Sequence, residues 1–196
     1  MRLSSRFLAA SLAGCCLLAA VSAPLIAQDA KPAQPAVGTH VSPAASYDKL
    51  LSGMEKEFVD AAEAMPSDKF NFAPPVSAGD FKGVRSFGAQ VKHVADANYY
   101  FFGGDMSEAD MKAKGEAIDK LTSKDDIIKA LKDSFVQAHK YISGITDEND
   151  FVMTAHGTRG GMAAFGLAHM MDHYGQMCVY LRMNGIVPPA SRGNGM

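Results

Sequence analysis

The sequence predicts an all-α protein that folds as a four-helix bundle. Apolar residues recur at spacings of three and four in four separate stretches, which is the period of an amphipathic helix. No stretch alternates apolar and polar residues as a strand would, and no segment is repeated along the chain. Helices of this length, each with one apolar face, can bury those faces against one another, which favours a bundle.

Composition limits the classes of function. The chain has 196 residues, of which 47% are hydrophobic, and a formal net charge of −2, which suits one globular domain with tails. Nineteen Lys and Arg residues against 21 Asp and Glu residues leave no basic excess to neutralise phosphates. We therefore expect no nucleic-acid partner. Three cysteines are too few for a disulfide scaffold.

Residues 1–27 have the pattern of a secretory signal peptide. Arg2 and Arg6 precede an apolar run that ends in small residues at Ala27, and the sequence has no acidic residue in this stretch. A retained membrane helix is the alternative, because the run has about the 20 residues needed to span a bilayer. Ala and Ser dilute it, however, and Pro24 interrupts it. We predict cleavage after Ala27 and a periplasmic or secreted protein.

A lipoprotein is a second interpretation of the same segment. The residues Leu12-Ala13-Gly14-Cys15 resemble a bacterial lipidation box, with Cys15 as the lipidated residue. Against this, the residues after Cys15 stay apolar, so cleavage there would cut the apolar core halfway. Either route places the mature domain outside the cytoplasm, and only lipidation would anchor it to a membrane. Cleavage after Ala27 would leave Cys178 as the sole cysteine, so no internal disulfide could form.

The first elements of the mature chain have clear boundary signals. Residues 28–45 are rich in Ala, Pro and Ser and lack an apolar period, so we expect a linker. Helical periodicity starts at Ser46 and ends at Pro66. The loop that follows, residues 67–85, is long, but its aromatic residues could pack it onto the core.

The next two long helices also have recognisable ends. Ser86 is the expected cap of the second helix, which Gly103 stops. Residues 105–121 are charged and variable, and we expect at most a short helix there. The sequence Ser123-Lys124-Asp125-Asp126 resembles a capping box and starts the third helix, which ends at Gly144.

The last long helix completes the predicted bundle. It starts between Thr154 and Gly161 and runs to Gly185, after which two prolines forbid its continuation. The predicted domain therefore spans residues 46–191, and residues 192–196 form a tail.

Three of the six histidines could meet at one metal ion. His169 and His173 are four residues apart, so both lie on one face of a helix and can bind the same ion. His93 on the second helix would complete a three-His site with open positions for water or substrate. The alternative is that each is an ordinary polar residue on a half-buried face, and spacing by itself leaves both open.

Several neighbours could take part in such a site. Gln176 and Tyr180 continue the face of the paired histidines, and we predict that they bind substrate. Asp96 lies one turn from His93 and is the candidate catalytic residue, as a general base or a partner of the ligand; a plain surface acid is the alternative. Met170 stands where zincin peptidases have a Glu, which disfavours that class.

Together these motifs resemble the DinB-like superfamily. The similarity covers roughly Tyr47 to Ser191, and the stretches that carry it are Ser86-Phe87-Gly88, His93 to Ala97, His169 to Gln176, and Tyr180 to Pro189. The resemblance implies a four-helix bundle with an unusual connection order and a divalent metal held by His93, His169 and His173. Characterised relatives include thiol-dependent transferases and isomerases, and many are dimers.

The resemblance and the residues together predict a divalent-metal protein that acts on a small molecule. Three neutral imidazoles leave the ion its full charge, which lowers the pKa of a bound water or thiol. We expect a metal-dependent hydrolase or a thiol or nucleophile transferase, with zinc, nickel, manganese or iron. A homodimer is one assembly that the resemblance suggests. Most relatives look cytoplasmic, so predicted export sets this chain apart and speaks against a cytoplasmic thiol as co-substrate.

A different class of function remains open from the sequence. The chain has 12 methionines, and Met170 and Met171 lie between the paired histidines. An exported bundle with such residues could bind or carry copper without catalysis. Against this, methionine fills cores routinely, and no Met-x-x-Met cluster occurs. A vestigial site in a purely structural bundle is the third alternative.

Overall fold

The computed structural model describes residues 34–193. The predicted signal peptide, its cleavage site and Cys15 lie outside the described residues. The chain divides into two units, and the second, which begins at His40, holds all the described helices. None of these helices is both long enough and apolar enough to cross a membrane.

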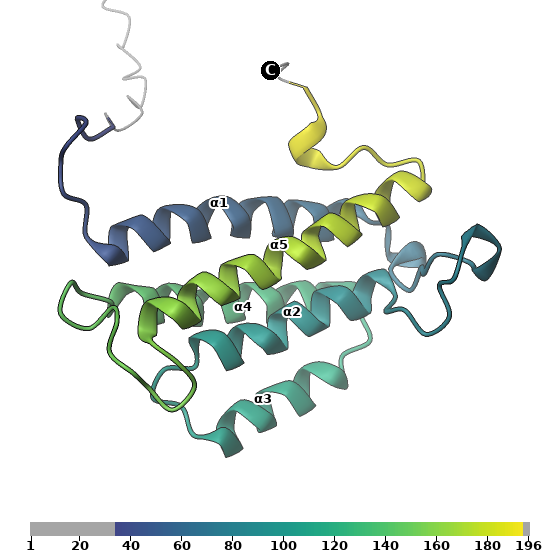
Figure 1. Cartoon of the computed structure of the whole chain (residues 1–196). Helices are drawn as coiled ribbons and strands as arrows, with labels where there is room; N and C mark the ends of the chain where they lie inside the picture. The colour runs from purple at the N-terminus through teal and green to yellow at the C-terminus, as the bar shows by residue number, and fades with distance from the viewer. Residues whose placement is uncertain (1–33, 194–196) are drawn as a thin grey trace, which may run out of the picture. The chain divides into compact units, whose positions relative to one another are not determined.

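The helical unit confirms the prediction of an all-α fold. Within residues 34–193 no strand is formed, apart from one isolated bridge. Four long helices and one shorter helix follow one another along the chain (Figure 1): α1 Pro43–Ala64, α2 Phe87–Phe102, α3 Glu108–Asp119, α4 Lys124–Ser143 and α5 Arg159–Met183.

The four long helices pack in a ring that differs from their order in the chain. α1 packs against α4 and α5, and α2 packs against the same two helices, so α1 and α2 each contact both of the others. The shorter α3 packs against α2 on the outside of the bundle (Figure 1). The predicted four-helix bundle is therefore confirmed, with α3 as an addition to one of its faces.

Each α-helix starts at a hydroxyl residue that accepts a hydrogen bond from a backbone N–H of the first turn; these caps are Ser42, Ser86, Ser107, Ser123 and Thr158. Such caps satisfy donors that have no partner inside the helix. The predicted caps Ser86 and Ser123 are confirmed. The first helix begins at Pro43 rather than at Ser46, because Ser42 caps it and proline is tolerated in the first turn.

The long loop between α1 and α2 fixes the start of α2. The Phe87 amide donates to the Phe72 carbonyl at 2.8 Å, and the Gly88 amide donates to the Phe70 carbonyl at 2.7 Å. Phe70 is buried, and its ring meets that of Phe87 edge-on, with centroids 5.5 Å apart. As expected, the loop's aromatic residues pack onto the core, and they hold the first turn of the helix that carries His93.

α2 and α5 approach each other closely at Gly166. A Cβ atom at this position would lie 2.5 Å from Cζ of Phe102 and 3.0 Å from Cβ of Phe101, closer than nonbonded carbons can pack. Both phenylalanines are buried in α2. The missing side chain therefore sets the distance between the two helices one turn before His169.

Candidate metal centre

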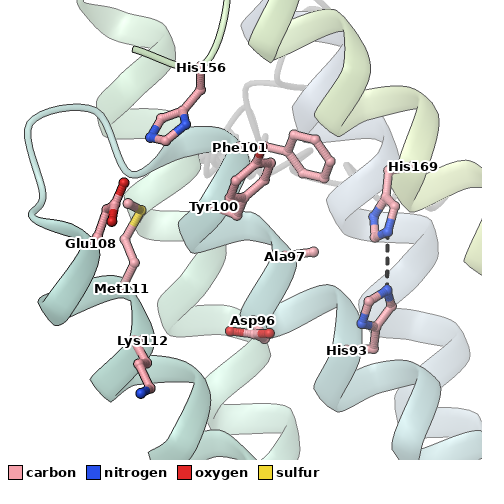
Figure 2. Close-up of a pocket in the computed structure, with 10 residues that line it drawn as sticks. All are labelled: His93, Asp96, Ala97, Tyr100, Phe101, Glu108, Met111, Lys112, His156 and His169. Carbon is pink, nitrogen blue, oxygen red and sulfur yellow. Dashed lines mark hydrogen bonds between the residues drawn. The ribbon is translucent and has the colours of Figure 1, made fainter.

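Three histidine side chains converge between α2 and α5. His93 extends from α2, and His169 and His173 extend from successive turns of α5. Nε2 of His169 lies 3.2 Å from Nε2 of His93 and 3.2 Å from Nε2 of His173. His173 is buried and the other two are half-buried. Figure 2 shows His93 and His169 pointing at each other from their separate helices.

The geometry of these nitrogens fits a divalent metal ion. Zinc binds histidine nitrogen at about 2.0–2.1 Å, so two nitrogen ligands on one tetrahedral ion are about 3.3 Å apart. The two observed separations of 3.2 Å match this spacing, and the ligand atoms of all three residues lie within 4.8 Å of one another. Within residues 34–193, no other group of histidine, cysteine and acidic side chains has such an arrangement.

The imidazoles are held in the form that binds metals. Burial, reinforced by the charge of Arg85 and by His169, lowers the pKa of His93 from its ordinary value to about 4. Burial, together with the two neighbouring imidazoles, also lowers the pKa of His173 to about 4. Burial likewise lowers the pKa of His169. At neutral pH these rings are uncharged and have a lone pair free for an ion.

A buried amide determines which nitrogen of His173 carries the proton. Nδ1 of His173 lies 2.6 Å from Oε1 of Gln90, which is 2% exposed. Because an amide oxygen only accepts, Nδ1 must be the donor, and Nε2 keeps its lone pair facing the other histidines. Gln90 is difficult to identify as a partner of His173 from the sequence. Its one sequence signal is a polar residue one turn before His93 in a largely apolar helix.

A pocket opens beside the three histidines. Its volume is about 510 Å³, which lies in the range of small-molecule sites. His93 and His169 lie at one end, and Tyr100 and Phe101 of α2 form an apolar wall (Figure 2). His156, from the loop before α5, lies at the far side of the pocket. A second hollow of about 420 Å³ shares five lining residues with this pocket and extends it.

Asp96 lies in the same pocket, as a catalytic role would require. Its carboxylate packs against the backbone of α3 at Gly115, where a Cβ atom would collide with it. The residue as a whole is exposed, but this contact covers part of the carboxylate. Burial and the nearby charge of Asp119 raise the pKa of Asp96 above its ordinary value. Asp96 is thus placed to exchange a proton with a molecule in the pocket.

The three-histidine site and the helical bundle can be compared with known protein families. The DinB superfamily matches residues 50–177, which is more than half of the chain. The chain belongs to the DinB superfamily. No curated protein matches it. The matched region contains His93, His169 and His173, and DinB-superfamily proteins bind metals.

The DinB bundle places the two predicted substrate-binding residues elsewhere than the pocket. Oε1 of Gln176 accepts a hydrogen bond from Nε2 of Gln90 at 2.8 Å, so Gln176 supports the amide that contacts His173. Tyr180 is buried, and its hydroxyl donates to the Arg85 carbonyl at 3.2 Å. Neither lines the pocket. Helical spacing correctly put them on the histidine face, but that face continues into the core beyond the pocket.

Two further histidines, His139 and His40, lie apart from the candidate metal centre. His139 of α4 bridges α1, with Nδ1 2.6 Å from Asp48 and Nε2 2.8 Å from Glu55. Partial burial lowers its pKa, but the hydrogen bonds and charges of the two carboxylates outweigh burial and raise the pKa of His139 overall. His40 pairs with Asp147 on the surface. His139 therefore joins α4 to α1 through both of its ring nitrogens.

Proposed function

We propose that this protein is a metal-dependent hydrolase or nucleophile transferase that acts on a small molecule. The observation that carries the proposal is the convergence of three imidazole Nε2 atoms, two of them on residues that line a pocket of about 510 Å³. A divalent ion bound there would supply positive charge that activates a bound water or thiol and polarises a carbonyl group. Three imidazole ligands suit zinc, nickel, manganese or iron.

The residues around the pocket have separate roles in this proposal. Asp96 takes up or delivers the proton that a hydrolytic or transfer step requires, because it lines the same pocket as His93 and His169. Tyr100, Phe101 and Met111 bind the apolar part of the substrate and exclude water from it. His156 at the far side can hold a polar substituent by hydrogen bonding.

Metal analysis of the purified chain tests the first half of the proposal. We expect close to one equivalent of a divalent metal, and loss of most of it in His93→Ala, His169→Ala and His173→Ala. His40→Ala is the matched control, because His40 is exposed and pairs only with Asp147. A chain that binds no added divalent metal would overturn the proposal. Selective copper(I) binding that survives His93→Ala would point to a carrier instead.

Activity measurements test the second half. A panel of esters, amides and activated thiol acceptors is assayed with the metal-loaded protein and with Asp96→Asn. We expect turnover to fall at least tenfold in Asp96→Asn while the metal content is unchanged, because the carboxylate lies in the pocket and not among the three ligands. Turnover that persists in His169→Ala would refute metal-dependent catalysis.

We also propose that the protein is exported. The support comes from residues 1–27, with two arginines before a long apolar run. Mass spectrometry of the mature chain from a bacterial periplasm or culture medium tests this. An N-terminus at Gln28 is the expected result, lipid attached to Cys15 would indicate a lipoprotein, and an uncleaved cytoplasmic chain would contradict export.

A further inference from the structure

A chain of side-chain hydrogen bonds runs away from the metal centre behind His173. Nδ1 of His173 lies 2.6 Å from Oε1 of Gln90, and Nε2 of Gln90 donates to Oε1 of Gln176 at 2.8 Å. Nε2 of Gln176 in turn lies 3.5 Å from Oδ2 of Asp172. This series of hydrogen bonds thus crosses from α5 to α2 and back to α5, and it ends on the exposed carboxylate of Asp172.

All the donors in this chain point the same way. His173 donates to Gln90, Gln90 donates to Gln176, and Gln176 donates toward Asp172. Each link polarises the next when the donors are aligned, and a carboxylate at the end strengthens the effect. The first link is short and buried, the second is short and partly buried, and the last is long and exposed, so most of the influence on His173 comes from Gln90.

His169, the other candidate ligand from α5, lacks such support. Nδ1 of His169 is buried and has no hydrogen-bond partner among the described residues. Gln90, in contrast, is buried in an apolar helix face, where an amide is costly unless its polar atoms are paired. Its oxygen and its nitrogen contact His173 and Gln176 respectively. The hydrogen bonds of the buried Gln90 amide are therefore made to these two side chains.

We propose that Gln90 is a positioning residue of the metal centre, which fixes the tautomer and ring orientation of His173, and that Gln176 holds Gln90 in place. The proposal rests on the metal binding proposed above. By accepting the proton of Nδ1, Gln90 keeps Nε2 unprotonated and makes it a stronger donor to a metal ion. Partners of this kind typically change metal affinity by about 10–100-fold.

Two substitutions at Gln90 separate positioning from packing. Gln90→Leu keeps a similar volume and removes the acceptor, whereas Gln90→Glu keeps an acceptor oxygen at the same place. Gln137→Leu is the matched control, because Gln137 is another interhelical glutamine, and it donates to the Phe102 carbonyl at 2.8 Å, away from His173. Gln176→Leu removes the second link only.

Two measurements are made on each variant. The first is the ¹⁵N NMR pattern of the His173 ring in the metal-free protein, which reports the tautomer, and the second is zinc affinity by competition with a chelator. We expect a single Nδ1–H tautomer in the wild type and in Gln90→Glu, but mixed tautomers and about 10–100-fold weaker zinc binding in Gln90→Leu. Gln176→Leu should weaken zinc binding less, and Gln137→Leu should change neither quantity.

The outcomes separate this inference from the proposed function. An unchanged tautomer in Gln90→Leu, or zinc binding as tight as in the wild type, would overturn the role of Gln90 even if the centre binds metal. If the wild type binds neither zinc nor any other added divalent metal, the proposed function fails, and the tautomer measurement still decides whether Gln90 orients His173. If Gln90→Leu does not fold, Gln90→Glu decides the matter, because mixed tautomers in that variant would refute the inference.

Discussion

Replacement of Gly166 by alanine should separate α2 from α5 and destabilise the bundle. The added Cβ atom would lie 2.5 Å from Cζ and 2.7 Å from Cε2 of Phe102, and 3.0 Å from Cβ of Phe101. Carbon atoms in contact prefer about 3.5–4.0 Å, so the helices or the buried rings must move by about 1 Å. Such overpacking costs about 1–3 kcal/mol.

The same helix provides a control that isolates this cost. Gly175 is exposed, and a Cβ atom there would meet no other atom within 4 Å. Either substitution gains about 0.5–1 kcal/mol, because alanine loses less backbone entropy in a helix than glycine. The gain cancels between the variants, so Gly166→Ala should be less stable than Gly175→Ala by the overpacking term of about 1–3 kcal/mol.

Denaturant unfolding monitored by circular dichroism measures this difference, and thermal unfolding should show a gap of about 2–12 °C for a domain of this size. Zinc affinity should also fall in Gly166→Ala, because His169 lies one turn further along α5 and would move with it away from His93. Equal stability of the two alanine variants would refute the close approach of α2 and α5 at Gly166.

Three further predictions concern charge and hydrogen bonding. Because the pKa of His139 is raised in the folded state, its stabilising effect should be fully present below pH 6.5 and lost as the pH rises through the folded-state pKa; the unfolding free energies of wild type and His139→Gln should therefore differ more at pH 6 than at pH 9, and a constant difference would contradict this. Because burial lowers the pKa of all three histidines, to about 4 for His93 and His173, zinc affinity should start to weaken at a lower pH than it would with three ordinary imidazoles; a steep loss of affinity starting at pH 6.5 would show ordinary imidazoles instead. Tyr180→Phe removes a hydroxyl that donates to a backbone carbonyl, so it should lower the unfolding free energy by about 0.5–1.5 kcal/mol and leave zinc affinity unchanged. Weaker zinc binding in this variant would show that the Tyr180 hydroxyl does contribute to the metal centre.

Local features were predictable because they depend on a few adjacent residues. The caps at Ser86 and Ser123 follow from hydrogen bonding within one helical turn, and α4 ends at Gly144, where the sequence predicts its end. The pairing of His169 with His173 follows from the helical period, because residues four apart share a face. The start of α1 at Pro43 rather than Ser46 is harder to predict, since a capping serine beside a proline also fits a linker.

The sequence by itself therefore determined the helices, their apolar faces and the candidate ligands. Only the tertiary structure brought His93 to within 3.2 Å of His169, because that distance depends on how closely α2 and α5 pack at Gly166. The packing of α2 against α5 likewise decided that the side chain of Gln176 contacts Gln90 and does not line the pocket. A helical pattern tells which residues share a face, whereas the residues that meet across two helices depend on side-chain volumes along the whole interface.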